Sequence, residues 1–507
     1  MRFSRVLLPS VLALLPIIAS AAPQSRERTT VEVVQVPVSV TTNGSSVRGL
    51  TRDNFTLRVN GKTQPIDYFD VIDFAAVSNE QLRDPRQRRL YVLAFDLPNT
   101  DMFSMLRGRR AAEEYLANAQ PSDYFAVALI NRYGDIEFIV PFTRDRDALR
   151  RAVATLSAAA PKDPLRLTVS PAERAVFTFD NRAEIEQLRH MGANVAAEQM
   201  IEANRNRLAD ELDSLGNLAQ RMAPLEGYKH VVLLSGGFND GLLMTNTRIS
   251  TFRGVAEPQL AANRNSIHFD SRVPFAQQQM QKKFAAAGVF LDAIDVTGLR
   301  PYDAPSDISL HFLVADTGGQ VVEHRNDLLG AMKQLTDSQQ VVYLLSFRAP
   351  QTGRKENSIS VRVNGTPRGS NVAYRESYPS TPDKPASNDG LRLADIIIND
   401  VPQNGVTMTT SVAASQNRVV VNVALPGREL AALAGDDAKT EGEALMYVFA
   451  GQKAVAFAKQ EINVHGGANV DIAQSFDLPP GTYAMKVLVR LENDTMAFAR
   501  KDFTIGD

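Results

Sequence analysis

The sequence predicts an α/β protein that has a doubly wound parallel sheet, a small flanking β domain and a C-terminal β-sandwich. Three observations support this. Between residues 89 and 345, apolar runs of strand length alternate with helical patterns, which is typical of a parallel sheet covered on both faces. Residues 30–75 alternate apolar and polar side chains, as a half-buried strand does. Residues 390–507 contain short strand patterns at a spacing of about 8–12 residues. A chain of 507 residues has room for about three such domains.

The composition excludes several classes of protein. The 55 basic and 57 acidic residues give a net charge of −2, which argues against a nucleic-acid partner or an anionic membrane surface. The apolar content of 44% is too high for a disordered chain. The chain has no cysteine, so disulfides, thiol catalysis and cysteine-bound metals are excluded.

Residues 1–22 have the pattern of a secretory signal peptide. Arg2 and Arg5 precede an apolar stretch, and Ala19-Ser20-Ala21 is a small-residue cleavage site. This stretch is short for a membrane span, and no later segment has about 18 consecutive apolar residues. We therefore expect export to the periplasm or the extracellular space, with no transmembrane segment after cleavage. An exported chain without cysteine tolerates any redox state.

The first β segment, residues 30–75, begins with an alternating strand that contains Pro37. Proline has no N–H for a sheet ladder, so we expect an edge strand or a bulge there. A second strand pattern runs into Asn60-Gly61, a pair that favours a hairpin turn. Residues 346–378 return to a β pattern. We expect them to pair with residues 30–75 and complete one small β domain.

The α/β domain, residues 89–345, is predicted element by element from its periodicity. Right-handed crossovers would place its helices on both faces of the sheet. Residues 236–272 are a polar insertion beside the edge where the strands end. The strands are expected at 90–95, 125–130, 136–142, 231–234, 289–294 and 320–323, and the helices at 102–119, 145–156, 183–222, 275–287, 308–316 and 326–339.

The C-terminal part begins with a Pro-, Ser- and Asp-rich stretch, residues 376–389, which predicts a linker. Residues 390–507 are predicted to be all-β. The expected strands lie at 419–423, 445–449, 455–457, 476–478, 483–491 and 496–503.

Polar residues follow three of the buried strands. Asp96 to Thr100 follow the first, Ser235-Gly236-Gly237 the second and Asp295-Val296-Thr297 the third. In doubly wound sheets, ligands bind outside the carboxyl ends of the strands. Carboxylate and hydroxyl oxygens are the ligands that a hard divalent cation prefers. The sequence therefore predicts a polar site at this edge.

Seven short segments, in order, resemble the secreted bacterial VWFA-related family, whose members contain a von Willebrand factor type A (VWA) domain. The resemblance covers residues 31–378 and implies a Rossmann-like VWA fold. It also implies protein binding, often through a metal-ion-dependent adhesion site where a partner's carboxylate completes the coordination of Mg²⁺. The segments are Val34–Val38, Gly49–Phe55, Phe95–Thr100, Arg109–Ala112, Phe142–Asp145, Tyr228–Phe238, and Ile294–Leu299 with Ala315–Gly319.

The chain departs from the family's metal motif at two positions. The first motif is D-x-S-x-S; Asp96 and Thr100 match it in type, but Pro98 replaces the central serine. Gly236 stands where the family has an aspartate that binds the metal. A further threonine ligand cannot be placed among Thr168, Ser170 and Thr178.

The resemblance therefore implies a degenerate metal site formed by Asp96, Thr100, Ser235 and the nearby Asp240. No cofactor is certain, and Mg²⁺ is the one that these residues suggest. The alternative is structural: Asp96 would cap a turn or helix, and Ser235 would satisfy the end of its strand.

These observations favour an exported, non-enzymatic protein-binding or adhesion-type protein. A protein partner would contact the strand-end edge and the 236–272 insertion. The alternative is a structural or assembly component of the bacterial envelope, in which the edge of the VWA domain has no binding function. A third hypothesis, a hydrolase using Asp96, Ser235 and Asp295, is disfavoured because a nucleophile elbow needs glycine where Leu233 stands.

Overall fold

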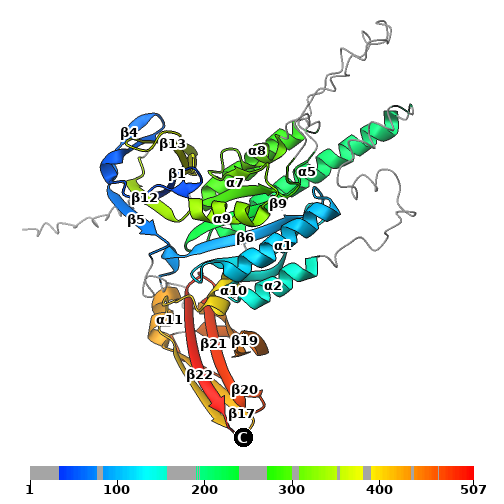
Figure 1. Cartoon of the computed structure of the whole chain (residues 1–507). Helices are drawn as coiled ribbons and strands as arrows, with labels where there is room; N and C mark the ends of the chain where they lie inside the picture. Colours follow the sequence, from blue (N-terminus) through cyan, green and yellow to red (C-terminus); the bar gives the residue numbers. More distant parts are fainter. Residues whose placement is uncertain are drawn as a thin grey trace, which may run out of the picture.

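The computed structural model describes residues 33–76, 84–156, 190, 192, 194–238, 242, 271–299, 308–350, 354–380, 390–434, 439–465 and 467–506. The predicted signal peptide, Asp240, the three candidate threonine and serine ligands and most of the 236–272 insertion lie outside these residues. Within them the fold is mixed α/β with several sheets, which confirms the predicted class (Figure 1).

The central sheet has six strands in the order β11-β10-β9-β6-β7-β8. Neighbouring strands are parallel except β7 and β8, which a short turn joins as an antiparallel pair. The sheet is therefore mixed rather than wholly parallel. Its strands are β6 (Arg89–Asp96), β7 (Tyr124–Ile130), β8 (Ile136–Thr143), β9 (Tyr228–Ser235), β10 (Val289–Asp295) and β11 (Val321–Val322).

Helices cover both faces of this sheet because alternate residues of its strands point to opposite sides. In β6, Leu90, Val92 and Ala94 belong to one core, while Tyr91, Leu93 and Phe95 belong to the other. The first core includes α5 (Asn194–Met222), α7 (Arg272–Ala287) and α8 (Ser309–Val314). The second includes α1 (Met102–Asn118), α2 (Arg146–Thr155) and α9 (Leu328–Ser338).

The small β unit is assembled from both sides of the α/β domain. Strand β1 (Val33–Thr42) pairs with β12 (Val341–Arg348) and β14 (Asn371–Tyr374), and β12 also pairs with β5 (Tyr68–Asp73). A second sheet has the order β15-β13-β3-β4. Its strands are β3 (Phe55–Val59), β4 (Lys62–Gln64), β13 (Glu356–Val363) and β15 (Ser377–Pro379). Three short elements complete the region: β2 (Ser45–Ser46), which pairs with β1, and the 3₁₀ turns η1 (Arg52–Asn54) and η3 (Pro85–Gln87).

The edge-strand prediction for Pro37 is confirmed locally. Over residues 33–37, β1 pairs with β12 on one side only, because β14 pairs with residues 38–41. Pro37 lies one residue before β14 begins to pair. Pro37 therefore lies in a stretch of β1 that is open on one side, where a residue without an N–H is tolerated.

The C-terminal unit contains two sheets that share one core. The first has the order β16-β17-β20 and the second β19-β18-β21-β22. Tyr483 Oη donates a hydrogen bond to the Pro479 carbonyl at 2.8 Å. The strands are β16 (Thr409–Ser415), β17 (Arg418–Leu425), β18 (Lys439–Ala450), β19 (Lys453–His465), β20 (Val470–Asp477), β21 (Gly481–Leu491) and β22 (Met496–Ile505).

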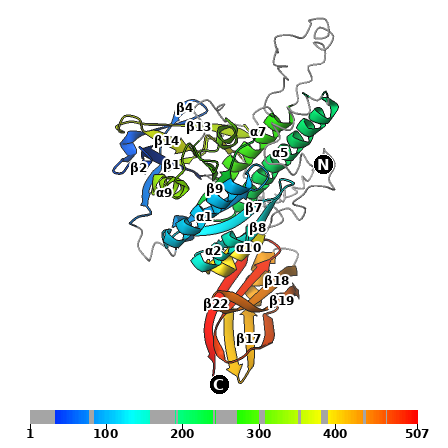
Figure 2. The ribbon, with the colours of Figure 1, turned by 45° about the vertical axis from the view of Figure 1, so that its right-hand side comes forward.

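Two predictions for this part of the chain are wrong. Residues 377–379 of the expected linker form β15, and the expected all-β region contains α10 (Gly390–Asn399) and α11 (Gly427–Ala434). Helix α10 lies between the central sheet and the C-terminal unit (Figures 1 and 2). Of the helices in the described part of the chain, none combines the length and hydropathy that crossing a bilayer requires.

Candidate functional site

The candidate site lies at the carboxyl edge, by which we mean the edge of the central sheet where β6, β7, β9 and β10 end. Asp96, Ser235 and Asp295 are the last residues of three adjacent strands and are all buried. Asp295 pairs in register with Ser235. The parallel order of these strands is what places the three side chains at one edge.

Asp96, Thr100 and Ser235 lie together, and their polar atoms are already engaged. Ser235 Oγ donates to Asp96 Oδ2 at 2.5 Å and accepts from the Gly237 N–H at 2.9 Å. Thr100 Oγ1 accepts from the Gly236 N–H at 3.1 Å. The two hydroxyl groups therefore tie the β6 and β9 loops to each other.

Gly236 stands where the VWA resemblance expects an aspartate, and the structure explains the glycine. A Cβ atom at this position would lie 2.6 Å from the Asn99 carbonyl oxygen and 3.1 Å from Thr297 Cγ2. The two loops are too close for any side chain here. An aspartate at position 236 would require the β6 loop to move.

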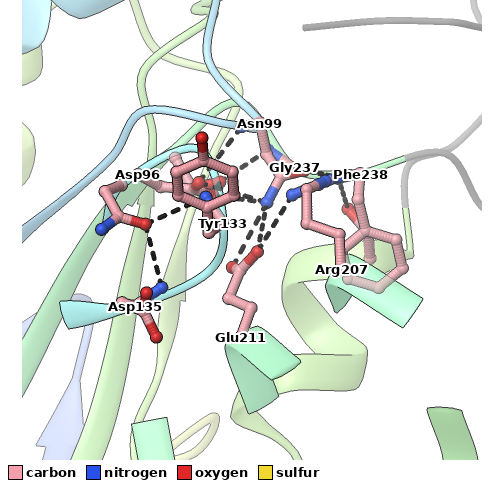
Figure 3. A network of polar contacts seen from close by, with 11 residues as sticks. Asp96, Asn99, Tyr133, Asp135, Arg207, Glu211, Gly237 and Phe238 are labelled. Carbon is pink, nitrogen blue, oxygen red and sulfur yellow. Dashed lines mark hydrogen bonds and ion pairs between the residues drawn. The ribbon is translucent and has the colours of Figure 1, made fainter. Parts of the chain in front are cut away.

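Three further residues complete the buried network, which we define as Asp96, Asn99, Arg207, Glu211 and Ser235 (Figure 3). Asn99 Nδ2 lies 3.0 and 3.1 Å from the two Asp96 carboxylate oxygens and 2.9 and 3.2 Å from those of Glu211. Arg207 Nη2 donates to Asn99 Oδ1 at 2.9 Å, and Arg207 Nη1 lies 3.3 Å from Glu211 Oε2. An amide nitrogen thus lies between two carboxylates, with a guanidinium beside it.

Burial perturbs both acids of this network. The pKa of Glu211 rises to about 8, first because the side chain is buried and then because Asp96 is nearby. Burial also raises the pKa of Asp96, although hydrogen bonds from Ser235 and Asn99 oppose the rise. Two buried carboxylates face one guanidinium, so a single retained proton balances the charge. We assign that proton to Glu211 at neutral pH.

The donor set does not fit Mg²⁺. This ion requires near-octahedral oxygen ligands, yet an N–H donor and a guanidinium approach the carboxylates here. The hydroxyl groups of Thr100 and Ser235 are held by other partners, and Gly236 contributes no side chain. Within the described residues, no group of three or more His, Cys, Asp or Glu side chains could hold a metal. No functional step is assigned to a metal at this edge.

The sequence reasoning missed Asn99, Arg207 and Glu211. Arg207 and Glu211 are four residues apart on α5 and resemble an exposed helical ion pair. They are buried because the β7–β8 turn packs on them: a Cβ atom at Gly134 would lie 2.9 Å from the Glu211 nitrogen. One signal was present, because Glu211 falls on the same stripe as the buried Leu208, Leu212 and Leu215.

Two of the three residues of the hydrolase hypothesis contact each other, and the third, Asp295, has a different partner. Ser235 donates to Asp96, while Asp295 Oδ1 accepts from the Thr297 N–H and hydroxyl group at 2.8 and 2.5 Å. His230, which could have served as a base, lies 2.9 Å from Asp292 and stacks between Tyr91 and Phe290.

Exposed apolar side chains also lie at the carboxyl edge. They lie in the first turns of α1 and α7, in the β7–β8 turn, after β10 and just before α8, so all of them are at this edge. They make up six of the twelve large apolar side chains that the described residues expose. The six are Met102 (57% exposed), Phe103 (79%), Tyr133 (52%), Phe275 (60%), Leu299 (62%) and Ile308 (47%).

Comparisons with known proteins give little similarity. No family model matches the chain, and no curated protein matches it. BatB from Bacteroides thetaiotaomicron is 11% identical over 50% of this chain and 99% of its own, with a TM-score of 0.26. An aerotolerance-related membrane protein from Bacteroides fragilis is 12% identical over 50% of this chain and 98% of its own, with a TM-score of 0.25. These values are too low to carry an argument about this chain.

Proposed function

We propose that this chain is an exported, non-enzymatic protein-binding protein, in which a VWA-type domain with a degenerate adhesion site receives a protein partner at its carboxyl edge without a metal. The observation that carries the proposal is the set of six exposed apolar side chains at that edge. Exposed apolar clusters rimmed by polar residues are typical of protein-interaction surfaces. Export rests on the signal-peptide pattern of residues 1–22.

The network below this surface supports a preformed binding site. Asn99 fixes the loop that leads to Met102 and Phe103, and Gly134 packs the Tyr133 turn against α5. The Leu299 N–H donates to Asn326 Oδ1 at 3.0 Å. Loops held in this way lose little conformational entropy on binding, which favours affinity.

We further propose that the C-terminal unit is an immunoglobulin-like β-sandwich that acts as a spacer or a second interaction module. Seven strands in two sheets around one core support this. The Tyr483–Pro479 hydrogen bond at the start of β21 has the form of a tyrosine corner, a feature of such sandwiches.

The test is site-specific photocrosslinking in the cells that produce the protein. A photoreactive phenylalanine analogue replaces Phe103 at the carboxyl edge, Tyr68 on β5 or Phe457 on β19. Tyr68 is a matched control because it is 70% exposed and lies on β5 of the small β unit rather than at the carboxyl edge. We expect a discrete protein adduct from position 103 only. An absent adduct at 103, or the same adduct from 68, would refute the proposal, and an adduct from 457 alone would favour the structural alternative.

Purified variants then test the surface with the partner so identified. Phe103→Ser and Leu299→Ser should each weaken binding by about tenfold or more, because exposed apolar anchors contribute on the order of 1–2 kcal/mol. Tyr68→Ser should leave the affinity unchanged. Excess EDTA should also leave it unchanged, and a loss of binding in EDTA would contradict the metal-independent mode.

A further inference from the structure

A second feature lies away from the carboxyl edge, at the junction of the small β unit and the α/β domain. A cavity of about 610 Å³ is bounded by β1, β5, the start of β9, the turn after α7 and the segment around Arg375. We call it the junction cavity. Its volume is in the range of small-molecule sites. The aromatic rings of Tyr228, Phe290 and Tyr378 contribute to its wall.

Three cationic side chains line the junction cavity, of which Lys229 is buried, Arg375 is half-buried and Arg86 is exposed. Lys229 is only 7% exposed, and its Nζ donates to the Ala223 carbonyl at 3.1 Å. Arg375 Nη2 donates to the Gln35 carbonyl at 2.7 Å, while its Nε is buried without a hydrogen-bond partner. Among the described residues, neither Lys229 nor Arg375 forms an ion pair with a carboxylate. The cavity thus holds two positive groups with unused donor capacity.

In the part of the chain that the structure describes, the acidic side chains of the cavity wall form no ion pair with Lys229 or Arg375. Asp84 pairs with Arg86 at 3.1 Å, and Asp70 Oδ1 accepts from the Val71 N–H at 2.8 Å. Glu226 also lines the cavity, and its backbone carbonyl accepts from Arg88.

Burial disfavours the charged state of both Lys229 and Arg375, and Arg375 also disfavours that of Lys229. Burial lowers the pKa of Lys229 to about 7, and the charge of Arg375 contributes to this shift. Burial lowers the pKa of Arg375 to about 10. Buried charges are normally paired, since an unpaired one costs free energy. An anion between them would supply the missing countercharge.

We propose that the junction cavity binds a small organic anion, a carboxylate or a phosphate monoester on an apolar body, between the Lys229 ammonium and the Arg375 guanidinium. The charged end would take the unused donors, including Arg375 Nε. The apolar body would contact the aromatic wall. This site is independent of the protein-binding surface proposed above.

The test is calorimetric titration of the protein with phenyl phosphate and with phenylacetate, which separate the two anion chemistries on one apolar body. Benzyl alcohol is the neutral comparison. We expect binding of at least one anion and none of the alcohol. Lys229→Gln and Arg375→Gln should each weaken binding by about tenfold or more, the effect of one charged hydrogen bond. Arg368→Gln removes the same charge from an exposed arginine of the β unit and should leave the affinity unchanged.

A pH series gives a second readout. Phenylacetate stays ionised from pH 6 to 9, so its affinity should fall as Lys229 loses its proton near pH 7. This fall should be absent in Lys229→Gln. If Lys229→Gln does not fold, as judged by circular dichroism, Arg375→Gln decides the outcome. No binding of either anion at about 10 mM, equal binding of benzyl alcohol, or wild-type affinity in both variants would overturn the proposal.

Discussion

Among single residues, Asn99 makes the largest contribution to the buried network at the carboxyl edge. Its side-chain amide donates toward Asp96 and Glu211, and its carbonyl accepts from Arg207. One neutral side chain thereby separates two buried carboxylates and connects them to a guanidinium. Removing the amide nitrogen or the carbonyl oxygen of Asn99 would leave buried charged groups without partners. The free-energy cost would exceed that of losing an ordinary hydrogen bond.

Asn99→Asp replaces the amide nitrogen by an oxygen and places a third carboxylate between Asp96 and Glu211. We expect the free energy of unfolding to fall by about 3–5 kcal/mol. Mg²⁺ or Mn²⁺ should restore part of this loss, because three carboxylates form an oxygen-rich site. Urea unfolding with and without the metal measures both effects. Asn99→Ala is the control, and equal rescue of this variant would contradict the interpretation.

Glu211 should give the protein a pH-dependent stability. Its folded-state pKa is about 8 against an ordinary 4.5, so between these values the folded state binds more protons than the unfolded state. The contribution of Glu211 to the free energy of unfolding should therefore be largest below pH 4.5, and it should fall as the pH rises to 8. The slope is at most about 1.4 kcal/mol per pH unit.

Glu211→Gln should remove this slope, because the amide does not titrate. Urea unfolding at pH 5, 6.5 and 8 compares the two proteins, and Asp213→Asn, an exposed acid on the same helix, is the control. Parallel pH profiles for wild type and Glu211→Gln would show that Glu211 has an ordinary pKa.

The sequence indicated part of this site for a physical reason. Asp96, Thr100 and Ser235 could be found because they follow apolar strand patterns, and parallel strands end at one edge. Arg207 and Glu211 could not be found by the same logic. Their burial depends on the β7–β8 turn, which reaches them through tertiary packing at Gly134.

At the scale of elements, the buried strands and the helices of the α/β domain follow from local periodicity, but β16, α10 and α11 do not. Ile396-Ile397-Ile398 is a run of β-branched residues, which is typical of a strand. The segment is helical because it is buried from two sides. Leu391 packs in the α/β core, Ile396 and Ile397 pack against the C-terminal unit, and Asp395 contacts Arg88. Tertiary contacts outweigh local propensity here.

The Arg88–Asp395 pair fixes α10 to the α/β domain. Both side chains are 3% exposed, and the pair is bidentate. Asp395→Ala should lower the free energy of unfolding by about 3–5 kcal/mol, because Arg88 is left buried and unpaired. Asp502→Ala removes an exposed partner of Arg500 and should cost less than about 1 kcal/mol. Similar losses in urea unfolding would contradict a special role for the buried pair.

At the scale of the whole molecule, α10 connects the α/β domain to the C-terminal unit. Asn399 Nδ2 donates to the Phe142 carbonyl at 2.8 Å, and Lys486 Nζ donates to the Ile397 carbonyl at 2.8 Å. These contacts couple two bodies that could otherwise unfold separately (Figure 2).

We expect this coupling to appear in calorimetry. The α/β domain and the C-terminal unit should melt in one overlapping transition in the wild type, and Asp395→Ala should separate it into two. Widely separated transitions in the wild type, or an unchanged single transition in the variant, would show that α10 does not couple them.

The pairing of β1 with β12 and β14 also affects the order in which the chain can fold. The Thr42–Ser370 hydrogen bond joins residues 328 positions apart. Closing so long a loop early is entropically costly, and folding slows as contacts become more distant in sequence. The α/β domain is contained between β5 and β12, whose ends meet where Asp73 pairs with Val341. A nascent chain should therefore fold this domain first, and its completion would bring β1 and β12 within reach of each other.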